Sequence, residues 1–540
     1  MKKFLSLLLT LALMLSALCL PAVATTPEPT APEGYTSIYT WDELREAVIA
    51  DPAGKYWLEN DINVNDSTVL GDLGKTEAAP ISLYANRCLL GATASWVDDD
   101  TKGNGISFTG TLDGNNKVID IGGKYVEYKG NTKSKSAGAI LFYTLGGTVK
   151  NLTVQNVNIV SNPLGGCQQG VIAVDIPSNV DGATIENVKV SASYTKKTED
   201  NNSVNFGGLI GRNSKEGTTL TIKDCTVTLN ATIPEGKAGN VAGLVGTVSK
   251  VSTLNISGCT VKGTASVGTG IAGGMVGSVT VAATVSISNC KNEATLSGVH
   301  VGGQIGSITG DATVTVNNSS SNTGALNGTT NAGGIVGRLE AAATLSALGY
   351  KSQGAISGTN VGGLIGSLTK AATITANEVS VTGTLTGTHT HARVGYIALA
   401  DLFTVAAPTL RADGGLDFNV TIDKELLSDV TVVGGTQVGM MITLSSNIPA
   451  TGFTTVGMAA LGEPTDANSA YYMNKSAAWN TLFDLEEDQT FKAYISNVKT
   501  ENAEKEFSCV AYVTFEYNGG EYTVYSSVAT GTPSALASAT

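Results

Sequence analysis

The stretch Gly333-Gly334-Ile335-Val336-Gly337 is one of six close copies of a motif, Gly-Gly-x-[Ile/Val]-Gly, that recurs along the middle of the chain. The other copies are Gly207-Gly208-Leu209-Ile210-Gly211, Ala242-Gly243-Leu244-Val245-Gly246, Gly273-Gly274-Met275-Val276-Gly277, Gly302-Gly303-Gln304-Ile305-Gly306 and Gly362-Gly363-Leu364-Ile365-Gly366. Their last glycines lie 35, 31, 29, 31 and 29 residues apart, and a weaker copy ends at Gly395 after 29 more. A fixed period of about 30 residues predicts a solenoid, in which each repeat is one coil stacked on the previous one.

A second strand follows the glycine motif in every clear repeat. Small polar residues alternate in it with Leu, Val or Ile, as in 253–256 (TLNI) and 313–316 (TVTV), so each strand has one wet face and one buried face. A third short strand, such as 226–229 (TVTL), completes the coil. Three strands per coil predict an all-β fold, a parallel β-helix, and we expect it to be right-handed because crossovers between parallel strands usually are.

The motif glycines have two expected roles, which are to permit positive φ at corners and to let neighbouring backbones come close. The facing of the apolar pair between them is left open. Strict alternation turns Leu244 inward and Val245 outward. Gln304 takes the place of Leu244 in its own coil, where burial of an amide costs free energy. A bulge at one glycine would let both rows face inward.

The N-terminal residues 1–24 have the pattern of a secretory signal peptide, with Lys2 and Lys3, an apolar run and a small-residue cleavage site after Ala24. Cys19 raises the alternative of a lipoprotein, but Leu18 fits poorly where a small residue is needed. No second apolar run is long enough to span a membrane. We therefore expect a secreted, extracellular protein, with residues 25–34 as a linker; retention at the cell surface stays open.

The segment 35–405 is predicted to be the β-helix, with clear repeats over 205–395 and an N-terminal cap over 35–110. Thr40 and Glu43 form a capping box before a short amphipathic helix. Such a helix would cover the first coil, whose strand edges and interior are otherwise exposed. Three acidic residues at 98–100 are more typical of a solvated loop than of a calcium site, although structural calcium stays open.

The chain changes character near residue 406. Alternating apolar residues over 416–422 and 507–515, with a turn at Asn518-Gly519-Gly520, indicate short antiparallel strands and hairpins. About 125 residues of such strands predict an Ig-like β-sandwich over 410–532.

The repeats resemble a known family. The Gly-Gly-Leu-Ile-Gly motif, with Asn289-Cys290 or Asp224-Cys225 before the next coil, is similar to the GLUG-motif repeats of bacterial surface proteins. Such repeats occur in adhesin-like secreted proteins and as accessory segments of IgA-specific metallopeptidases. The resemblance covers roughly residues 35 to 400 and implies a β-helix, but it does not specify a ligand.

The net charge and the placement of the cysteines limit the classes of partner and the bonding of the thiols that we expect. Removal of Lys2 and Lys3 takes the formal net charge from -13 to -15, which argues against nucleic acid or an anionic membrane as a partner. Cys225, Cys259 and Cys290 fall at one position of successive repeats, so we expect them to stack in the interior as free thiols and not as disulfides. We expect a monomer.

Catalytic and metal-binding patterns are weak. None of the three histidines, His300, His389 and His391, stands in a His-Glu-x-x-His motif. His389 and His391 could ligate a metal from one strand face, but a chance pair is the favoured interpretation. Asp120 and Asp175 are the best remaining carboxylates for acid–base chemistry. We therefore expect no catalytic site, no metal and no cofactor.

The sequence thus favours an adhesin-like repeat protein that binds an extracellular glycan or protein, or the cell wall, through an extended solenoid face. Two alternatives stay open, a polysaccharide lyase or hydrolase and a purely structural stalk. The threonine columns also match what an ice-binding face would need, although Asn255, Ser286 and Ser346 interrupt them.

Overall fold

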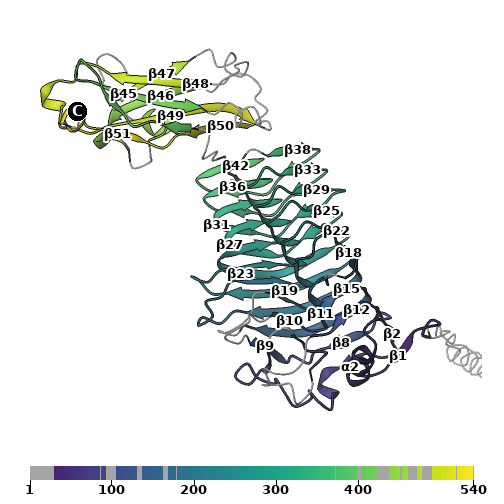
Figure 1. Cartoon of the computed structure of the whole chain (residues 1–540). Coiled ribbons are helices and arrows are strands. Elements are labelled where there is room, and N and C mark those ends of the chain that lie inside the picture. The colour runs from purple at the N-terminus through teal and green to yellow at the C-terminus, as the bar shows by residue number, and fades with distance from the viewer. Residues whose placement is uncertain are drawn as a thin grey trace, which may run out of the picture.

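A computed structural model describes residues 30–84, 87–92, 105–129, 137–161, 168–177, 179–370, 372–397, 403–422, 437–449, 453–459, 471–476, 489–517 and 520–538. The expected signal peptide, most of the linker, Asp98-Asp99-Asp100, Cys167 and Asn518-Gly519 lie outside these residues. The described part is almost entirely β-structure (Figure 1). Its few helices are α2 (Trp41–Ala50), α4 (Thr455–Ala459) and α5 (Pro533–Ser538), with 3-10 turns η1 (Val64–Asp66), η2 (Ser445–Asn447) and η4 (Thr500–Asn502).

Most of the chain is a parallel β-solenoid, seen in Figure 1 as a stack of coils that rises from α2 to β42. One face is a 10-stranded parallel sheet to which each coil contributes one strand. Its strands are β6 (Ser107–Phe108), β11 (Phe142–Leu145), β14 (Ala173–Asp175), β17 (Ile210–Asn213), β21 (Val245–Val248), β24 (Val276–Val279), β28 (Ile305–Ile308), β32 (Val336–Leu339), β37 (Ile365–Leu368) and β42 (Val394–Ile397). The predicted parallel coil stack is confirmed.

The other faces belong to a 32-stranded sheet, whose strands bend around each coil. One row, which carries the threonine columns, contains β2 (Lys55–Leu58), β7 (Thr111–Asp113), β12 (Thr148–Val160), β15 (Gly182–Thr195), β18 (Thr219–Lys223), β22 (Thr253–Ser257), β25 (Thr284–Ser288), β29 (Thr313–Asn317), β33 (Thr344–Leu348) and β38 (Thr373–Asn377). A second row, just before the glycine corner, contains β5 (Arg87–Cys88), β10 (Ala137–Ala139), β13 (Gln168–Gly170), β16 (Val204–Gly207), β20 (Gly239–Ala242), the end of β23 (Thr260–Gly273), the ends of β27 (Thr295–Gly302) and β31 (Leu326–Gly333), β36 (Asn360–Gly362) and β41 (His389–His391).

The remaining strands of this sheet complete the coils. They are β1 (Thr36–Ile38), β3 (Ile62–Asn63), β4 (Ile81–Tyr84), β8 (Val118–Asp120), β9 (Tyr125–Lys129), β19 (Thr226–Ile233), β26 (Lys291–Asn292), β30 (Ser321–Asn322), β34 (Lys351–Ser352), β35 (Ile356–Ser357), β39 (Ser380–Val381) and β40 (Leu385–Thr386).

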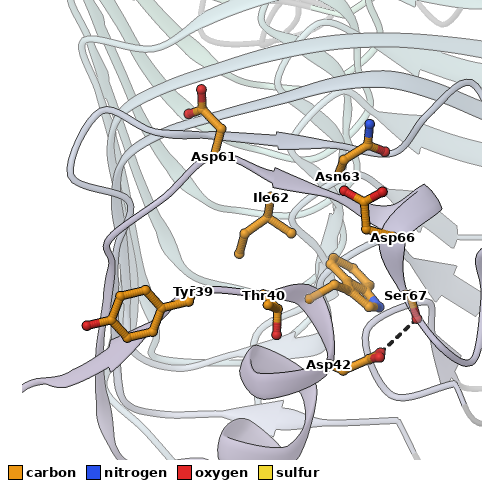
Figure 2. A pocket seen from close by; sticks show the side chains of 9 residues that line it. Tyr39, Thr40, Asp42, Asp61, Ile62, Asn63, Asp66 and Ser67 are labelled. Carbon is orange, nitrogen blue, oxygen red and sulfur yellow. Dashed lines mark hydrogen bonds between the residues drawn. The ribbon is translucent and has the colours of Figure 1, made fainter.

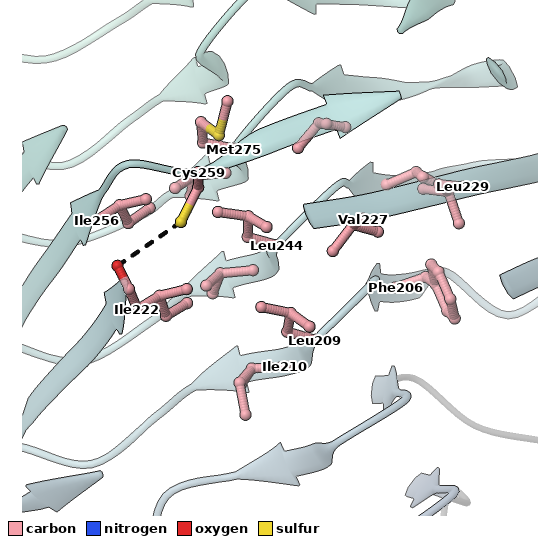
Figure 3. Close-up of a cluster of buried hydrophobic side chains, with 14 of the residues drawn as sticks. Phe206, Leu209, Ile210, Ile222, Val227, Leu229, Leu244, Ile256, Cys259 and Met275 are labelled. Carbon is pink, nitrogen blue, oxygen red and sulfur yellow. Dashed lines mark hydrogen bonds between the residues drawn. The ribbon is translucent and has the colours of Figure 1, made fainter. Parts of the chain in front are cut away.

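The glycine motif is a corner between two sheets. In the coil of Leu244, strand β20 ends at Ala242, the chain bends at Gly243 and Leu244, and β21 begins at Val245. Because the direction changes between them, Leu244 and Val245 both lie in the core, as do Leu209 and Ile210 in Figure 3. A bend, and not a bulge within one strand, therefore buries both apolar rows.

Gln304 is fully buried at the same corner. Its Nε2 donates to the Ser321 carbonyl at 3.0 Å, which offsets part of the desolvation of the amide.

Close backbone approach, and not positive φ, explains the motif glycines. A Cβ built on Gly303 would lie 2.1 Å from the Gly334 carbonyl oxygen of the next coil, and one on Gly302 would lie 1.8 Å from the Ile305 carbonyl oxygen. None of the six motif copies places a glycine at positive φ. The expectation of positive φ at these glycines is therefore wrong, because the chain bends with negative or extended φ values. Glycine is needed because the neighbouring coil lies too close to leave room for a side chain.

Positive φ occurs instead at a second corner, directly before the cysteine column. Asp224, Gly258 and Asn289 have φ of 53, 65 and 50°, and Asp, Asn and Gly are the residues that tolerate this region best. The residues after them, Cys225, Cys259 and Cys290, are buried free thiols. The hydrogen bond with Cys225, together with burial, raises the pKa of Cys259 to about 12, so this thiol stays protonated and unreactive.

Helix α2 packs against the first coil. Thr40 Oγ1 accepts a hydrogen bond from Glu43 N at 3.2 Å, whereas the Glu43 carboxylate accepts from Tyr39 N at 2.8 Å and not from Thr40 N. Trp41, Leu44 and Val48 are buried in the same hydrophobic cluster as the interior of the coils. The buried stripe at helical spacing thus faces the solenoid.

Two antiparallel sheets follow the solenoid. One contains β43 (Phe403–Val405), β44 (Thr409–Leu410), β45 (Leu416–Ile422) and β48 (Gln489–Ile495), and the other contains β46 (Gln437–Leu444), β47 (Tyr471–Ser476), β49 (Phe507–Tyr517), β50 (Gly520–Tyr525) and β51 (Ala529–Gly531). Phe418 of the first sheet and Ile442 and Cys509 of the second share one hydrophobic cluster. The two sheets therefore pack on each other.

Tyr522 joins the antiparallel region to the last coil. Its hydroxyl donates to the Val394 carbonyl at 2.8 Å, accepts from Val394 N at 3.2 Å and lies 3.0 Å from His391 Nδ1. Burial raises the pKa of Tyr522. Tyr522 and Val524 belong to the hydrophobic cluster of the solenoid, so part of the terminal coil is covered by β50.

Candidate functional site

The row from β18 to β38 forms a regular outward surface, which we call the hydroxyl face. Its strands pair in register without interruption, so identical positions of successive coils stack in columns. The first column is Thr219, Thr253, Thr284, Thr313, Thr344 and Thr373, and the second is Thr221, Asn255, Ser286, Thr315, Ser346 and Thr375. The outward residues at the last position of each strand are Lys223, Ser257, Ser288, Asn317, Leu348 and Asn377.

This surface is exposed and almost free of charge. Thr284, Thr313 and Thr344 are exposed, and their neighbours in the second column are partly exposed. From β22 to β38 none of the outward residues is charged, although the chain carries a net charge of -13. Within the described residues, the side chains of the first two columns make no hydrogen bonds with other protein groups. Each hydroxyl can donate one hydrogen bond and accept two, so the face offers a regular array of solvated donors and acceptors.

A hollow lies at the start of the hydroxyl face. It measures about 320 Å³ and is lined by Gly146, Gly147, Thr148, Asp181, Gly182, Ala183, Thr184, Thr219 and Thr221. Gly182 is the register partner of Thr219 in the preceding coil. A Cβ on Gly182 would lie 1.8 Å from the Thr219 carbonyl oxygen, so coil stacking requires glycine there. The Thr219 backbone fills the space that a Gly182 side chain would take, and the residues around the hollow include four threonines and Asp181.

A second polar surface, which we call the polar seam, runs along the glycine corner. Its members before the corner are Asn205, Asn240, His300, Asn331, Asn360 and His389, and those after it are Arg212, Thr247, Ser278, Ser307, Arg338, Ser367 and Tyr396. The two rows meet, because Asn240 Nδ2 donates to Ser278 Oγ at 3.2 Å and the His389 and Tyr396 rings lie 4.8 Å apart.

The side chains of the polar seam are bonded to one another. Asn331 Nδ2 lies 2.9 Å from His300 Nδ1, Asn360 Nδ2 donates to Asn331 Oδ1 at 2.8 Å, and Asn360 Oδ1 lies 2.8 Å from His389 Nδ1. This chain of contacts crosses four coils. Burial and the Arg338 guanidinium lower the pKa of His300 to about 4, so His300 is neutral at pH 7 and its Nδ1 acts as the acceptor for Asn331.

The comparisons with known proteins identify no family for this chain. No protein-family model matches the chain, and no curated protein matches it. Among solved structures, an IgA1 protease aligns at a TM-score of 0.28 and 17% identity, over 64% of this chain and 22% of that one. The chain thus spans less than a quarter of that protein's length.

The two C-terminal histidines have different surroundings. Both lie on β41, but His389 contacts Asn360 and Tyr396, whereas His391 Nδ1 accepts from Arg393 N at 3.0 Å and faces Tyr522. Burial and the nearby Arg393 lower the pKa of His391. Among the described residues no group of three or more His, Cys, Asp or Glu is arranged to hold a metal ion.

Asp120 and Asp175 are not brought together. Asp120 lies on β8 in the larger sheet, where Gln155 Nε2 and Asn156 Nδ2 donate to it at 3.0 and 2.9 Å. Asp175 lies on β14 in the 10-stranded sheet and pairs with Arg212 Nε at 2.7 Å. Each carboxylate is thus held by its own partners in a different sheet, which does not suit a pair of acid–base groups.

A small acidic pocket of about 80 Å³ lies beside α2 (Figure 2). Asp42, Asp61 and Asp66 line it with Tyr39. Burial disfavours the ionised form of Asp42, but hydrogen bonds from Ser67 and Thr68 outweigh it and lower the pKa of Asp42. The Asp42 carboxylate is therefore occupied in joining α2 to the turn after η1.

Sequence reasoning found the threonine columns but missed the polar seam. A signal for the seam was present, because Asn or His stands two residues before the first motif position in six of the repeats. These residues are register partners in successive coils, so their pairing with one another follows from coil stacking. Contacts with the second row, such as that of Asn240 with Ser278, could not be inferred, since they require the bend to bring the two rows together.

No helix among the described residues is long and apolar enough to cross a membrane.

Proposed function

We propose that this protein is a secreted, surface-associated adhesin-like protein that binds an extracellular partner along its solenoid. The observation that carries the proposal is the hydroxyl face, whose exposed columns keep register from β18 to β38 and make no hydrogen bonds to other described protein groups. Repetition of one weak contact over many coils yields useful affinity through multivalency.

The proposal includes finer features of the chain. We assign the repeats to the GLUG type on the motif and on the dipeptides Asp224-Cys225 and Asn289-Cys290, which precede the next coil. In this proposal the coils wind to the right, α2 caps the first coil, and the two antiparallel sheets form an Ig-like sandwich that spaces or anchors the solenoid. The Tyr522 contacts, which tie β50 to the last coil, support a fixed relation between the two parts.

A glycan array tests this function with the chain from residue 25 to 540, scored both for binding and for loss of the immobilised glycan. Binding to one glycan class that persists without loss of sugar is the expected result. Loss of sugar would instead favour a lyase or hydrolase. Absence of binding to glycans and to extracellular matrix proteins would contradict the proposal and favour a structural stalk.

A further inference from the structure

The hydroxyl face and the polar seam differ in whether their polar groups are available to a ligand. Seam side chains already bond to each other across coils, as in the Asn360 to Asn331 contact of 2.8 Å. Among the described residues, the threonine hydroxyls of the hydroxyl face have no protein partner and are open to solvent. A ligand that supplies hydrogen bonds therefore gains more at the hydroxyl face, because it need not break protein–protein bonds first.

The lack of charged side chains on the hydroxyl face favours neutral ligands over charged ones. Outward residues from β22 to β38 are uncharged, so an anionic or cationic polymer would lose hydration there without forming ion pairs. A neutral ligand rich in hydroxyl groups has no such cost. The face also contains no aromatic residue between β18 and β38, so each sugar unit would bind weakly and several would be needed.

We propose that the hydroxyl face binds a neutral polysaccharide that lies along the solenoid axis, with one sugar unit in the hollow at Gly182. This assignment rests on the proposed binding function and names its ligand class and its surface. The coils repeat at about 4.8 Å, which is close to the length of one sugar unit in an extended β-1,4-linked chain. Successive sugar units would thus meet equivalent threonines in successive coils.

The hollow differs from the hydroxyl columns because a charged residue, Asp181, is among its lining residues. Its volume of about 320 Å³ is open to solvent and has room for a sugar ring. A carboxylate can accept two hydrogen bonds from neighbouring hydroxyls of such a ring. The other lining residues are three glycines, Ala183 and four threonines. The hollow therefore fixes the position of one unit, while the columns contribute affinity in proportion to chain length.

The test compares two triple variants of the full chain. Thr284→Val, Thr313→Val and Thr344→Val remove three exposed hydroxyls from the first column while keeping side-chain shape and β-propensity. The control variant changes three exposed threonines on other strands, Thr232→Val, Thr295→Val and Thr329→Val. Thermal unfolding of both variants should match the unchanged protein, which shows that the fold is kept.

Binding is measured by calorimetry with cello-oligosaccharides of two to six units and by affinity electrophoresis with hydroxyethylcellulose, mannan, polygalacturonate and chitosan. We expect a neutral polymer to bind, with affinity that rises with oligomer length and is the same at low and high salt. The face variant should bind about tenfold or more weakly, and the control variant should bind normally.

Equal binding by both variants would overturn the assignment of this face while leaving an extracellular binding function in place. Salt-sensitive binding to polygalacturonate or chitosan alone would overturn the ligand class. Shaping of ice crystals by the unchanged protein but not by the face variant would assign the columns to ice. If the unchanged protein binds none of the polymers and no ligand on the array, both this inference and the proposed function fail.

Discussion

The hydroxyl face and the polar seam are both stacks of polar side chains on the same solenoid, repeated at the same coil spacing. They differ in geometry. The seam lies where the chain bends, so two rows meet and Asn240 reaches Ser278 across the corner. The hydroxyl face lies on a single row of strands, so its side chains have no opposing row. Equivalent polar residues are thus structural in one place and available for binding in the other.

The largest effect is expected from breaking the coil spacing that supports both surfaces. Gly303→Val would place a Cβ 2.1 Å from the Gly334 carbonyl oxygen, and a backbone contact cannot move aside. We expect a loss of about 3 kcal/mol or more in the free energy of unfolding, or failure to fold.

Gly217→Asn is the control, because Gly217 has φ of +73° with open space around it and Asn tolerates this conformation. Urea denaturation measures both, and equal stability of the two variants would contradict the role of close backbone approach.

A seam residue should matter more than a similar residue on the hydroxyl face. Asn331→Leu removes the partner of both His300 and Asn360, and each loses a hydrogen bond in a partly or fully buried site. We expect a cost of about 2 kcal/mol. Asn255→Leu, on the second column of the hydroxyl face, should change the free energy of unfolding by less than about 0.5 kcal/mol. Equal effects in chemical denaturation would show that the seam contacts do not stabilise the fold.

Protonation offers a way to weaken the seam without changing its shape. Because the pKa of His300 is lowered to about 4 in the folded protein, the unfolded chain binds a proton first as the pH falls. The stability that neutral His300 contributes is therefore complete above about pH 6.5 and is lost as the pH falls toward 4. His391, whose pKa is also lowered, acts in the same direction.

His300→Asn, which matches Asn331 and Asn360 in the same column, should reduce this loss. The measurement is the urea midpoint at pH 7 and at pH 4.5 for both proteins. A pH dependence that is identical in the unchanged protein and in the variant would remove His300 as its source.

The sequence allowed the coil stack, the threonine columns and the cysteine column to be placed, because each depends on a residue type that recurs with the repeat. The sequence did not predict which side chains are buried at the glycine corner. Alternation predicts opposite facing for Leu244 and Val245, but the bend at Gly243 and Leu244 buries both. The same bend brings the seam rows together, so the contact of Asn240 with Ser278 and the burial of Thr247 could not be derived from a period of two. The need for glycine at position 182 also depends on a local feature, since only the stacking of Gly182 on Thr219 shows that a side chain would collide with the Thr219 carbonyl oxygen.

The smallest expected effect on the free energy of unfolding comes from the same substitution, Thr→Val, made once in the polar seam and once on the hydroxyl face. Thr247 is buried in the seam, with its Oγ1 2.9 Å from Ser278 Oγ, whereas Thr315 lies in the second column of the hydroxyl face and makes no such contact with the described residues. Thr247→Val leaves Ser278 without this partner and should cost about 1 kcal/mol in the free energy of unfolding. Thr315→Val should be neutral within about 0.5 kcal/mol, because its hydroxyl has no partner among the described residues. It should still weaken polysaccharide binding, because the face loses one hydrogen-bonding group. If Thr315→Val destabilises as much as Thr247→Val in parallel urea titrations, the hydroxyls of the face serve the fold, and the case for a binding surface is lost.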